Sequence, residues 1–127
     1  ERAEMATEVG ADITVRIHGN GDDNSSVNGA LTMAPSTSNP YVSELAAESQ
    51  ALSKCIIDAY CNATGMKNRG VMITDTMTGI NWCTMPVTIV ELGFMSNPTD
   101  DTNMQDDAYQ VKMVNGIANG IDAYFAD

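Results

Sequence analysis

The chain has 127 residues, of which 43% are hydrophobic and 18% are charged, and this size suits one domain with one hydrophobic core. Its net charge of −11 argues against binding to nucleic acid or to an anionic membrane surface, because both would repel it. No apolar stretch approaches the roughly 20 residues that a membrane-spanning helix needs, so insertion into a bilayer is not expected.

The first third of the chain is predicted to contain a short helix, a strand and a long loop. Residues 2–9 resemble the last turns of a helix that a glycine closes. Residues 13–18 alternate between apolar and polar side chains, which places Arg16 and His18 on one face of a strand. Residues 19–39 are rich in Gly, Asn, Asp and Ser, and we expect them to form a loop of the length that is often functional.

The remainder of the chain is predicted to alternate between helices and strands. Asn39 and Pro40 are typical of a helix start, and this helix should continue to about residue 63. The other expected elements are strands at residues 70–75 and 87–92, a short helical segment at 102–105 after a turn, and a helix at 108–125. The apolar face of this last helix is expected to comprise Val111, Val114, Ile117, Ala118, Ile121 and Phe125.

Strands that are separated by helices predict an α/β fold, with a mostly parallel central sheet flanked by helices in three layers. In such sheets, ligands bind beyond the carboxyl ends of the strands. The sequence therefore directs attention to the residues at which the predicted strands end.

Glu91 is the one carboxylate in an apolar, strand-like run over residues 85–92. An ionised carboxylate inside a buried strand costs several kcal/mol unless it is paired, hydrogen-bonded or directed at a metal. Two interpretations follow, a structural glutamate that is satisfied by hydrogen bonds and a glutamate with a chemical role.

His18 is the only histidine, and it ends the first predicted strand. It could be structural, or it could bind zinc, although catalytic zinc usually has three protein ligands and a water. His18 and Glu91 should open toward the same edge of the sheet, where a carboxylate could act as general base on a water molecule. The three cysteines lack a zinc-binding spacing, and we expect them to be buried thiols.

Two motifs give the chain a resemblance to a known family. Residues 17–20 read Ile-His-Gly-Asn, and residues 90–98 read Val-Glu-Leu-Gly-Phe-Met-Ser-Asn-Pro. In this order and spacing, they resemble the histidine and glutamate motifs of the zinc-dependent N-acetylmuramoyl-L-alanine amidases, which are bacterial and phage peptidoglycan hydrolases. The resemblance extends over essentially the whole chain. It implies hydrolysis of the amide between the lactyl group of N-acetylmuramic acid and L-alanine of the stem peptide.

The resemblance also implies roles for individual residues. The family holds one Zn²⁺ with two histidines and one glutamate, and His18 matches the second histidine. Glu91 matches the catalytic glutamate, which takes a proton from the attacking water and passes it to the leaving amine. Asn20 and Asn97 match positions near the site but could equally hold turns. Arg69 could bind a substrate carboxylate or form a structural salt bridge.

The chain departs from the family pattern at its start. The family's first strand, first helix and second strand have no counterpart, so residues 1–127 are expected to be the N-terminally truncated, C-terminal portion of an amidase catalytic domain. Two of the three expected zinc ligands are therefore missing, and we expect weak zinc binding and little activity from the chain alone. Arg16 also departs from the family's small polar residue, and a cation near it would be disfavoured.

Two alternatives to a catalytic domain remain open. The chain could be a non-catalytic remnant that binds muropeptide or a protein partner, or a second chain could supply the missing strand and ligands. The resemblance implies a secreted, cell-wall location in a bacterium, as for an autolysin, or a phage endolysin that acts on the wall. A separate wall-binding module is expected in the parent protein, because the acidic chain has no electrostatic attraction to an anionic wall.

Overall fold

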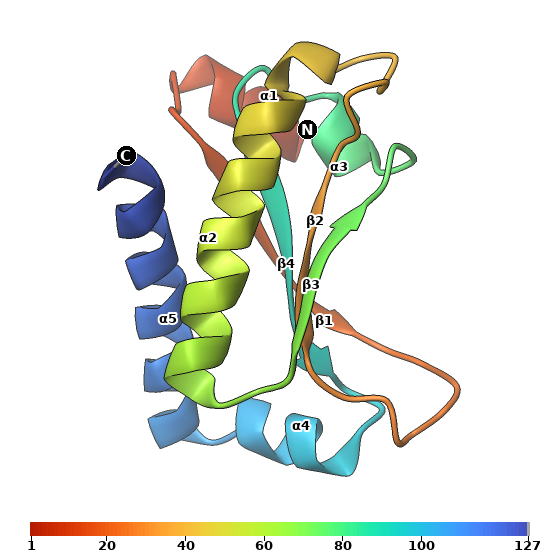
Figure 1. The fold of residues 1–127 in the computed structure, drawn as a ribbon, viewed down its shortest axis with the longest axis vertical. Helices are drawn as coiled ribbons and strands as arrows, with labels where there is room; N and C mark the ends of the chain where they lie inside the picture. The colour runs from red at the N-terminus through yellow and green to blue at the C-terminus, as the bar shows by residue number, and fades with distance from the viewer. Residues whose placement is uncertain (127) are drawn as a thin grey trace.

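Four strands form one mixed sheet at the centre of the protein. A computed structural model describes residues 1–126, and Asp127 lies outside them. The strands are β1 (Thr14–Asn20), β2 (Ala30–Ala34), β3 (Asn68–Ile73) and β4 (Val87–Phe94), and their order in the sheet is β1-β4-β2-β3 (Figure 1). β1 is parallel to β4 and β2 is parallel to β3, whereas β2 and β4 are antiparallel. The predicted α/β class with a mostly parallel sheet is confirmed.

Helices cover both faces of this sheet, which gives three layers. They are α1 (Arg2–Glu8), α2 (Ala46–Thr64), α3 (Thr78–Asn81), α4 (Pro98–Met104) and α5 (Asp107–Ala126). α2 and α5 lie side by side on one face (Figure 1), where Val90 packs against Leu52 and Ile56. α1 and α3 cover the other face, where Ile89 belongs to a cluster with Ala3 and Ile80. Alternate residues of β4 therefore serve two separate parts of the core.

The prediction of one continuous loop over residues 19–39 is wrong, because β2 lies within it. β2 has the sequence Ala-Leu-Thr-Met-Ala, and Ala30, Thr32 and Ala34 are fully buried. A strand that is covered on both faces lacks the alternation of polar and apolar residues that marks a half-exposed strand. Its two alanines also disfavour a strand prediction.

The second helix begins later than predicted. The side-chain oxygen of Asn39 accepts hydrogen bonds from the backbone N–H groups of Tyr41, at 2.8 Å, and Val42, at 3.0 Å. These bonds make a local turn. A short 3₁₀ segment, Ser43–Leu45, comes after the turn, and α2 begins at Ala46. Asn39 and Pro40 therefore mark a turn, and the sequence misplaced the helix start by one to two turns.

The short fourth helix begins earlier than predicted. Asn97 is its N-cap, accepting a hydrogen bond from the N–H of Asp100 at 3.0 Å, and Pro98 occupies the first helical position. Residues 98–101 are thus helical rather than part of the turn. α3 was not predicted at all, since its four residues carry no helical periodicity.

The predicted apolar face of α5 is only partly correct. Ile117 and Ile121 do pack on the core, but Val111, Val114 and Phe125 are 60%, 65% and 56% exposed. The buried residues of α5 are Met113, Gly116 and Gly120. The two glycines let α5 approach the backbone of α2 so closely that a Cβ on either would meet it. None of the helices in residues 1–126 has the length and apolar character to cross a membrane.

Candidate active site

The parallel pairing of β1 and β4 brings His18 and Glu91 together in the carboxyl-terminal half of each strand. The two residues are register partners in the parallel pairing of these strands. Glu91 lies two residues beyond Ile89, so its side chain is on the sheet face that α1 and α3 cover. The structure therefore places the two residues beside each other, but each strand continues two residues beyond its predicted end, so His18 and Glu91 lie within β1 and β4 and not at their ends.

Glu91 is a buried carboxyl group with incomplete hydrogen bonding. It is 7% exposed, and its Oε2 atom has no hydrogen-bond partner among residues 1–126. Burial raises the pKa of Glu91, and the nearby His18 partly opposes this shift. A structural glutamate satisfied by hydrogen bonds does not match this environment. An oxygen that is buried without a partner is instead available to a bound water or ligand.

Asn20 and Asn97 both hold turns at the carboxyl edge of the sheet, where β1 and β4 end. The side-chain oxygen of Asn20 accepts from the N–H of Gly21 at 2.8 Å. Asn97 caps α4, and its Nδ2 atom donates to the carbonyl of Ser25 at 3.0 Å, which fastens the loop between β1 and β2 beside the end of β4. Both amides are thus engaged by the protein's own backbone, as one of the sequence-based interpretations proposed.

Arg69 lies at the start of β3, near the end of β4. Its Nη1 atom donates to the carbonyl of Asn28 at 3.3 Å, and its guanidinium carbon lies 5.5 Å from the ring centroid of Phe94. Among residues 1–126, Arg69 takes part in no ion pair. Its guanidinium is held instead by an aromatic face and a carbonyl.

Asp100 is a residue of this edge that the sequence analysis missed. It is 5% exposed, and its Oδ2 atom accepts from the N–H groups of Gly29, at 2.9 Å, and Phe94, at 3.0 Å. One carboxylate oxygen thus joins the end of β4 to the residue before β2. Asn97 signalled a helix start in the sequence. Two adjacent aspartates, Asp100 and Asp101, lie in the first turn of that helix, and only the fold shows that Asp100 points inward.

A complete set of metal ligands is not present in the described part of the chain. No group of three or more His, Cys, Asp or Glu side chains within residues 1–126 is arranged to hold a metal ion. His18 and Glu91 supply one imidazole and one carboxylate, whereas a catalytic zinc usually has three protein ligands. These residues therefore do not fit a zinc ion by themselves.

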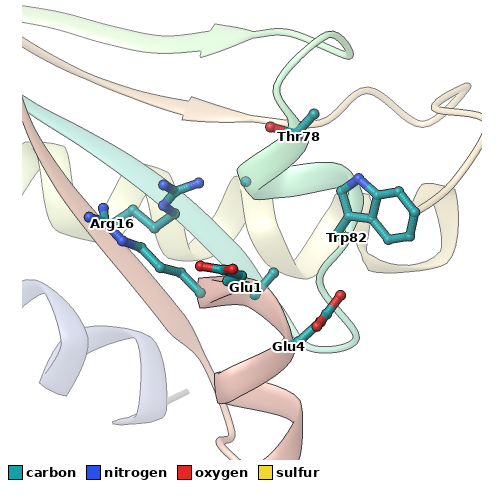
Figure 2. Close-up of a pocket in the computed structure, with 8 residues that line it drawn as sticks. Glu1, Glu4, Arg16, Thr78 and Trp82 are labelled. Atoms are coloured by element: carbon teal, nitrogen blue, oxygen red, sulfur yellow. The ribbon is translucent and has the colours of Figure 1, made fainter.

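A cavity of about 390 Å³ lies beside α1 and α3, on the same sheet face as Glu91 (Figure 2). Its polar and aromatic lining comes from Glu1 and α1, from β1, and from α3 with the residue that follows it: Glu1, Arg2, Glu4, Arg16, Thr78 and Trp82. Arg16 precedes His18 by two residues, so both side chains share one face of β1. The sequence singled out Arg16, but no sequence pattern indicated that Arg2 and Trp82 line the same cavity.

Comparison with known families and curated proteins gives a consistent result. Residues 1–123 match the family model described as N-acetylmuramoyl-L-alanine amidase. The chain is 31% identical to the uncharacterized protein YqiI of Bacillus subtilis over 126 residues, covering 98% of this chain and 57% of that protein. It is 30% identical over 125 residues to the N-acetylmuramoyl-L-alanine amidase LytC of the same species, covering 98% of this chain and 24% of LytC.

Solved structures of similar fold include two amidases. The catalytic domain of CwlV from Paenibacillus polymyxa superposes with a TM-score of 0.84 at 27% identity, covering 98% of this chain and 64% of that one. The CwlD amidase of Clostridioides difficile, solved in complex with the GerS lipoprotein, gives a TM-score of 0.87 at 28% identity, covering 98% and 60%. The chain thus spans less than two thirds of each of these relatives.

Proposed function

Because the chain belongs to the N-acetylmuramoyl-L-alanine amidase family, we propose that its protein hydrolyses the amide between the lactyl group of N-acetylmuramic acid and L-alanine in peptidoglycan. The observation that carries this proposal is the environment of Glu91. Its carboxyl is buried, one oxygen has no partner among residues 1–126, and it stands beside His18 near the carboxyl ends of β1 and β4. This is the part of an α/β sheet where ligands bind.

Glu91 is the general base of the proposed reaction. A general base works best when its pKa lies near the operating pH, and burial shifts the pKa of Glu91 in that direction. Its unpartnered Oε2 accepts a hydrogen bond from the attacking water and takes a proton from it. The same carboxyl then passes the proton to the amine of L-alanine as the amide bond breaks. The products are a lactyl carboxylate and a peptide with a free amino terminus.

Zinc is also part of the proposal. A bound zinc ion would polarise the scissile carbonyl and lower the pKa of a water, and His18 would be one of its ligands. Because no complete ligand set exists within residues 1–126, the remaining ligands would come from outside them. We further propose that the protein acts on the cell wall, because it is 32% identical over 129 residues to an uncharacterized cell wall amidase of Bacillus anthracis.

The activity test uses the complete polypeptide that its gene encodes, including any residues that precede Glu1. Mass spectrometry follows the release of stem peptide with a free L-alanine amino terminus from purified muropeptides. Glu91→Gln should lower kcat by about 10²- to 10⁴-fold, which is the usual contribution of a general base. Glu8→Gln, an exposed change of equal charge, serves as the control. If Glu91→Gln hydrolysed muropeptides as fast as the unaltered protein, Glu91 would not be the general base.

A second candidate function is muropeptide or partner binding without hydrolysis. The observation that favours it is the incomplete ligand set within the described residues. This candidate predicts that the complete polypeptide binds muropeptides but releases no peptide, even when zinc is supplied. Any release that depends on Glu91 would exclude it.

A further inference from the structure

Arg69 stands in line with Glu91 across the sheet. Leu31 of β2 is the register partner of Glu91 in the antiparallel pairing of β2 with β4. The pairing of β2 with β3 shifts by one residue at the same level, so Arg69 and Gly70 together stand opposite Leu31. Figure 1 shows that β3 begins at the end of the sheet where β4 ends. Two strand spacings therefore separate Glu91 from Arg69, which places their Cα atoms roughly 10 Å apart.

Arg69 and Glu91 also lie on the same face of the sheet. The residues before and after the shifted pair both face α2, because the Asn68 side chain donates to Asp58 of α2 at 2.9 Å and Val71 packs against the α2 cluster. Since side chains alternate along a strand, the position between them faces away from α2. Glu91 faces away from α2 as well, on the side that α1 and α3 cover.

Three contacts hold the side chain of Arg69. Its guanidinium carbon lies 5.5 Å from the ring centroid of Phe94, and its Nη1 atom donates to the carbonyl of Asn28 at 3.3 Å. Its stem lies beside Gly29, where a Cβ would come within 3.2 Å of the Arg69 Cγ atom. A side chain that is already ordered loses less entropy when it binds a ligand.

The groups that hold Arg69 are themselves joined to the strand that carries Glu91. The N–H groups of Gly29 and Phe94 both donate to the buried Oδ2 atom of Asp100, at 2.9 Å and 3.0 Å. Phe94 is the last residue of β4, three residues after Glu91. The position of the guanidinium is therefore fixed relative to the carboxyl group of Glu91.

Arg69 keeps most of its hydrogen-bond donors for a ligand. A guanidinium has five N–H donors, and within residues 1–126 only Nη1 of Arg69 has an acceptor. The side chain is exposed and takes part in no ion pair with the described residues. It is also one of only 6 Lys and Arg residues in a chain with 17 Asp and Glu residues. A planar anion such as a carboxylate matches these unused donors.

We propose that Arg69 binds a carboxylate of the substrate about three residues beyond the amide bond that Glu91 attacks. This inference rests on the proposed function. Three residues of an extended peptide span roughly 10 Å, which equals the separation of Glu91 and Arg69 across the sheet. An amide in the same place has no charge and only one acceptor oxygen. Arg69 should therefore make the enzyme prefer the acid over the amide.

The test measures kcat/KM of the complete polypeptide on two pairs of synthetic compounds. The first pair is N-acetylmuramoyl-L-alanyl-glycyl-glycine and its C-terminal amide, which carry the variable group on the third residue. The acid should have a kcat/KM about tenfold higher than the amide, as expected of charge-assisted hydrogen bonds. The second pair is N-acetylmuramoyl-L-alanine and its amide. These end two residues earlier, and Arg69 should give no preference between them.

Variants separate binding by Arg69 from a structural role and from a general effect of charge. Arg69→Gln should abolish the preference for the three-residue acid and leave the kcat/KM of its amide unchanged. Arg69→Lys keeps the charge but lacks the fork, so it should retain part of the preference, and it provides a second variant if Arg69→Gln does not fold. Lys67→Gln removes an equal charge from an exposed residue two positions away and should leave the preference intact.

Four outcomes would overturn the proposal. Equal kcat/KM for the three-residue acid and amide, or a preference that survives Arg69→Gln, would exclude this role of Arg69 and leave the amidase reaction standing. Equal losses on acid and amide in Arg69→Gln would show a structural role. A loss of preference in Lys67→Gln as large as in Arg69→Gln would show a general effect of charge. If the complete polypeptide hydrolysed none of the four compounds, the proposed function would fail together with this inference.

Discussion

His18 and Glu91 are register partners across β1 and β4, but among residues 1–126 no ion pair joins them. The imidazole lowers the pKa of the Glu91 carboxyl less than burial raises it. The environment of Glu91 therefore disfavours the charged form of its carboxyl group. This unfavourable free energy should lower the stability of the folded protein at a pH at which the group is charged.

Glu91→Gln should stabilise the folded chain at neutral pH. Burial raises the folded-state pKa of Glu91 above its unfolded value. The stability associated with this group is thus present below the unfolded pKa and is lost as pH rises through the folded pKa. We expect the variant to be more stable by about 1–3 kcal/mol at pH 8, the usual cost of an unsatisfied buried polar group, with the gain shrinking toward pH 4. Urea unfolding at both pH values measures it, and an equal gain at both would contradict the prediction.

Asp100→Ala should destabilise the protein by about 2–4 kcal/mol, because it leaves two backbone N–H groups without an acceptor. These are the N–H groups of Gly29 and Phe94, which bond the buried Oδ2 atom. The matched control is Asp101→Ala, since within residues 1–126 the Asp101 carboxylate accepts a hydrogen bond only from the exposed Gln105 side chain. Chemical denaturation of both variants should show a small loss for the control, and similar losses in the two would refute the role given to Asp100.

Gly120→Ala should destabilise the packing of α5 on α2 by about 1–3 kcal/mol. A Cβ at this position would collide with the backbone of Ile56. Intrinsic helix propensity alone would favour alanine by about 1 kcal/mol, so the two effects have opposite signs. Asn119→Ala, on the exposed side of the same helix, should be neutral or stabilising. If Gly120→Ala raised the thermal midpoint, the close helix contact would be disproved.

The isolated 127-residue chain should not retain stoichiometric zinc after dialysis against metal-free buffer. Residues 1–126 offer no group of three suitable side chains, and one imidazole with one carboxylate gives weak binding. Elemental analysis of the dialysed chain provides the measurement, with His18→Ala as the comparison. One equivalent of zinc that disappears in His18→Ala would show that the described residues do form a metal site.

Much of the secondary structure was predictable because its signals are local. Gly65 ends α2 in the left-handed conformation, with φ of 76°, as expected of a helix C-cap. β4 and the glutamate near its end were visible as an apolar run of strand-forming residues. β2 was not, because a short strand that is buried on both faces shows neither alternation nor strong strand propensity.

The sequence analysis also could not predict helix packing that depends on glycine and not on apolar side chains. The contact of α5 with α2 depends on Gly116 and Gly120, which contribute close approach rather than apolar surface. A search for an apolar stripe therefore selected Val111 and Val114, which the fold leaves exposed. The cavity around Arg2 and Arg16 was hidden for a related reason, since its lining residues come from elements that are distant in the chain.

The sequence by itself determined the α/β class and most of the helices and strands, and it singled out His18 and Glu91, although both lie within their strands and not at the strand ends. These properties follow from hydrophobic periodicity, caps and turns, which act over a few residues. Only the tertiary structure decided the strand order β1-β4-β2-β3, the inward orientation of Asp100 and the cavity that Arg2 and Arg16 both line. These depend on contacts between segments far apart in the sequence, whose free energy comes from burial and hydrogen bonds that exist only once the core has formed.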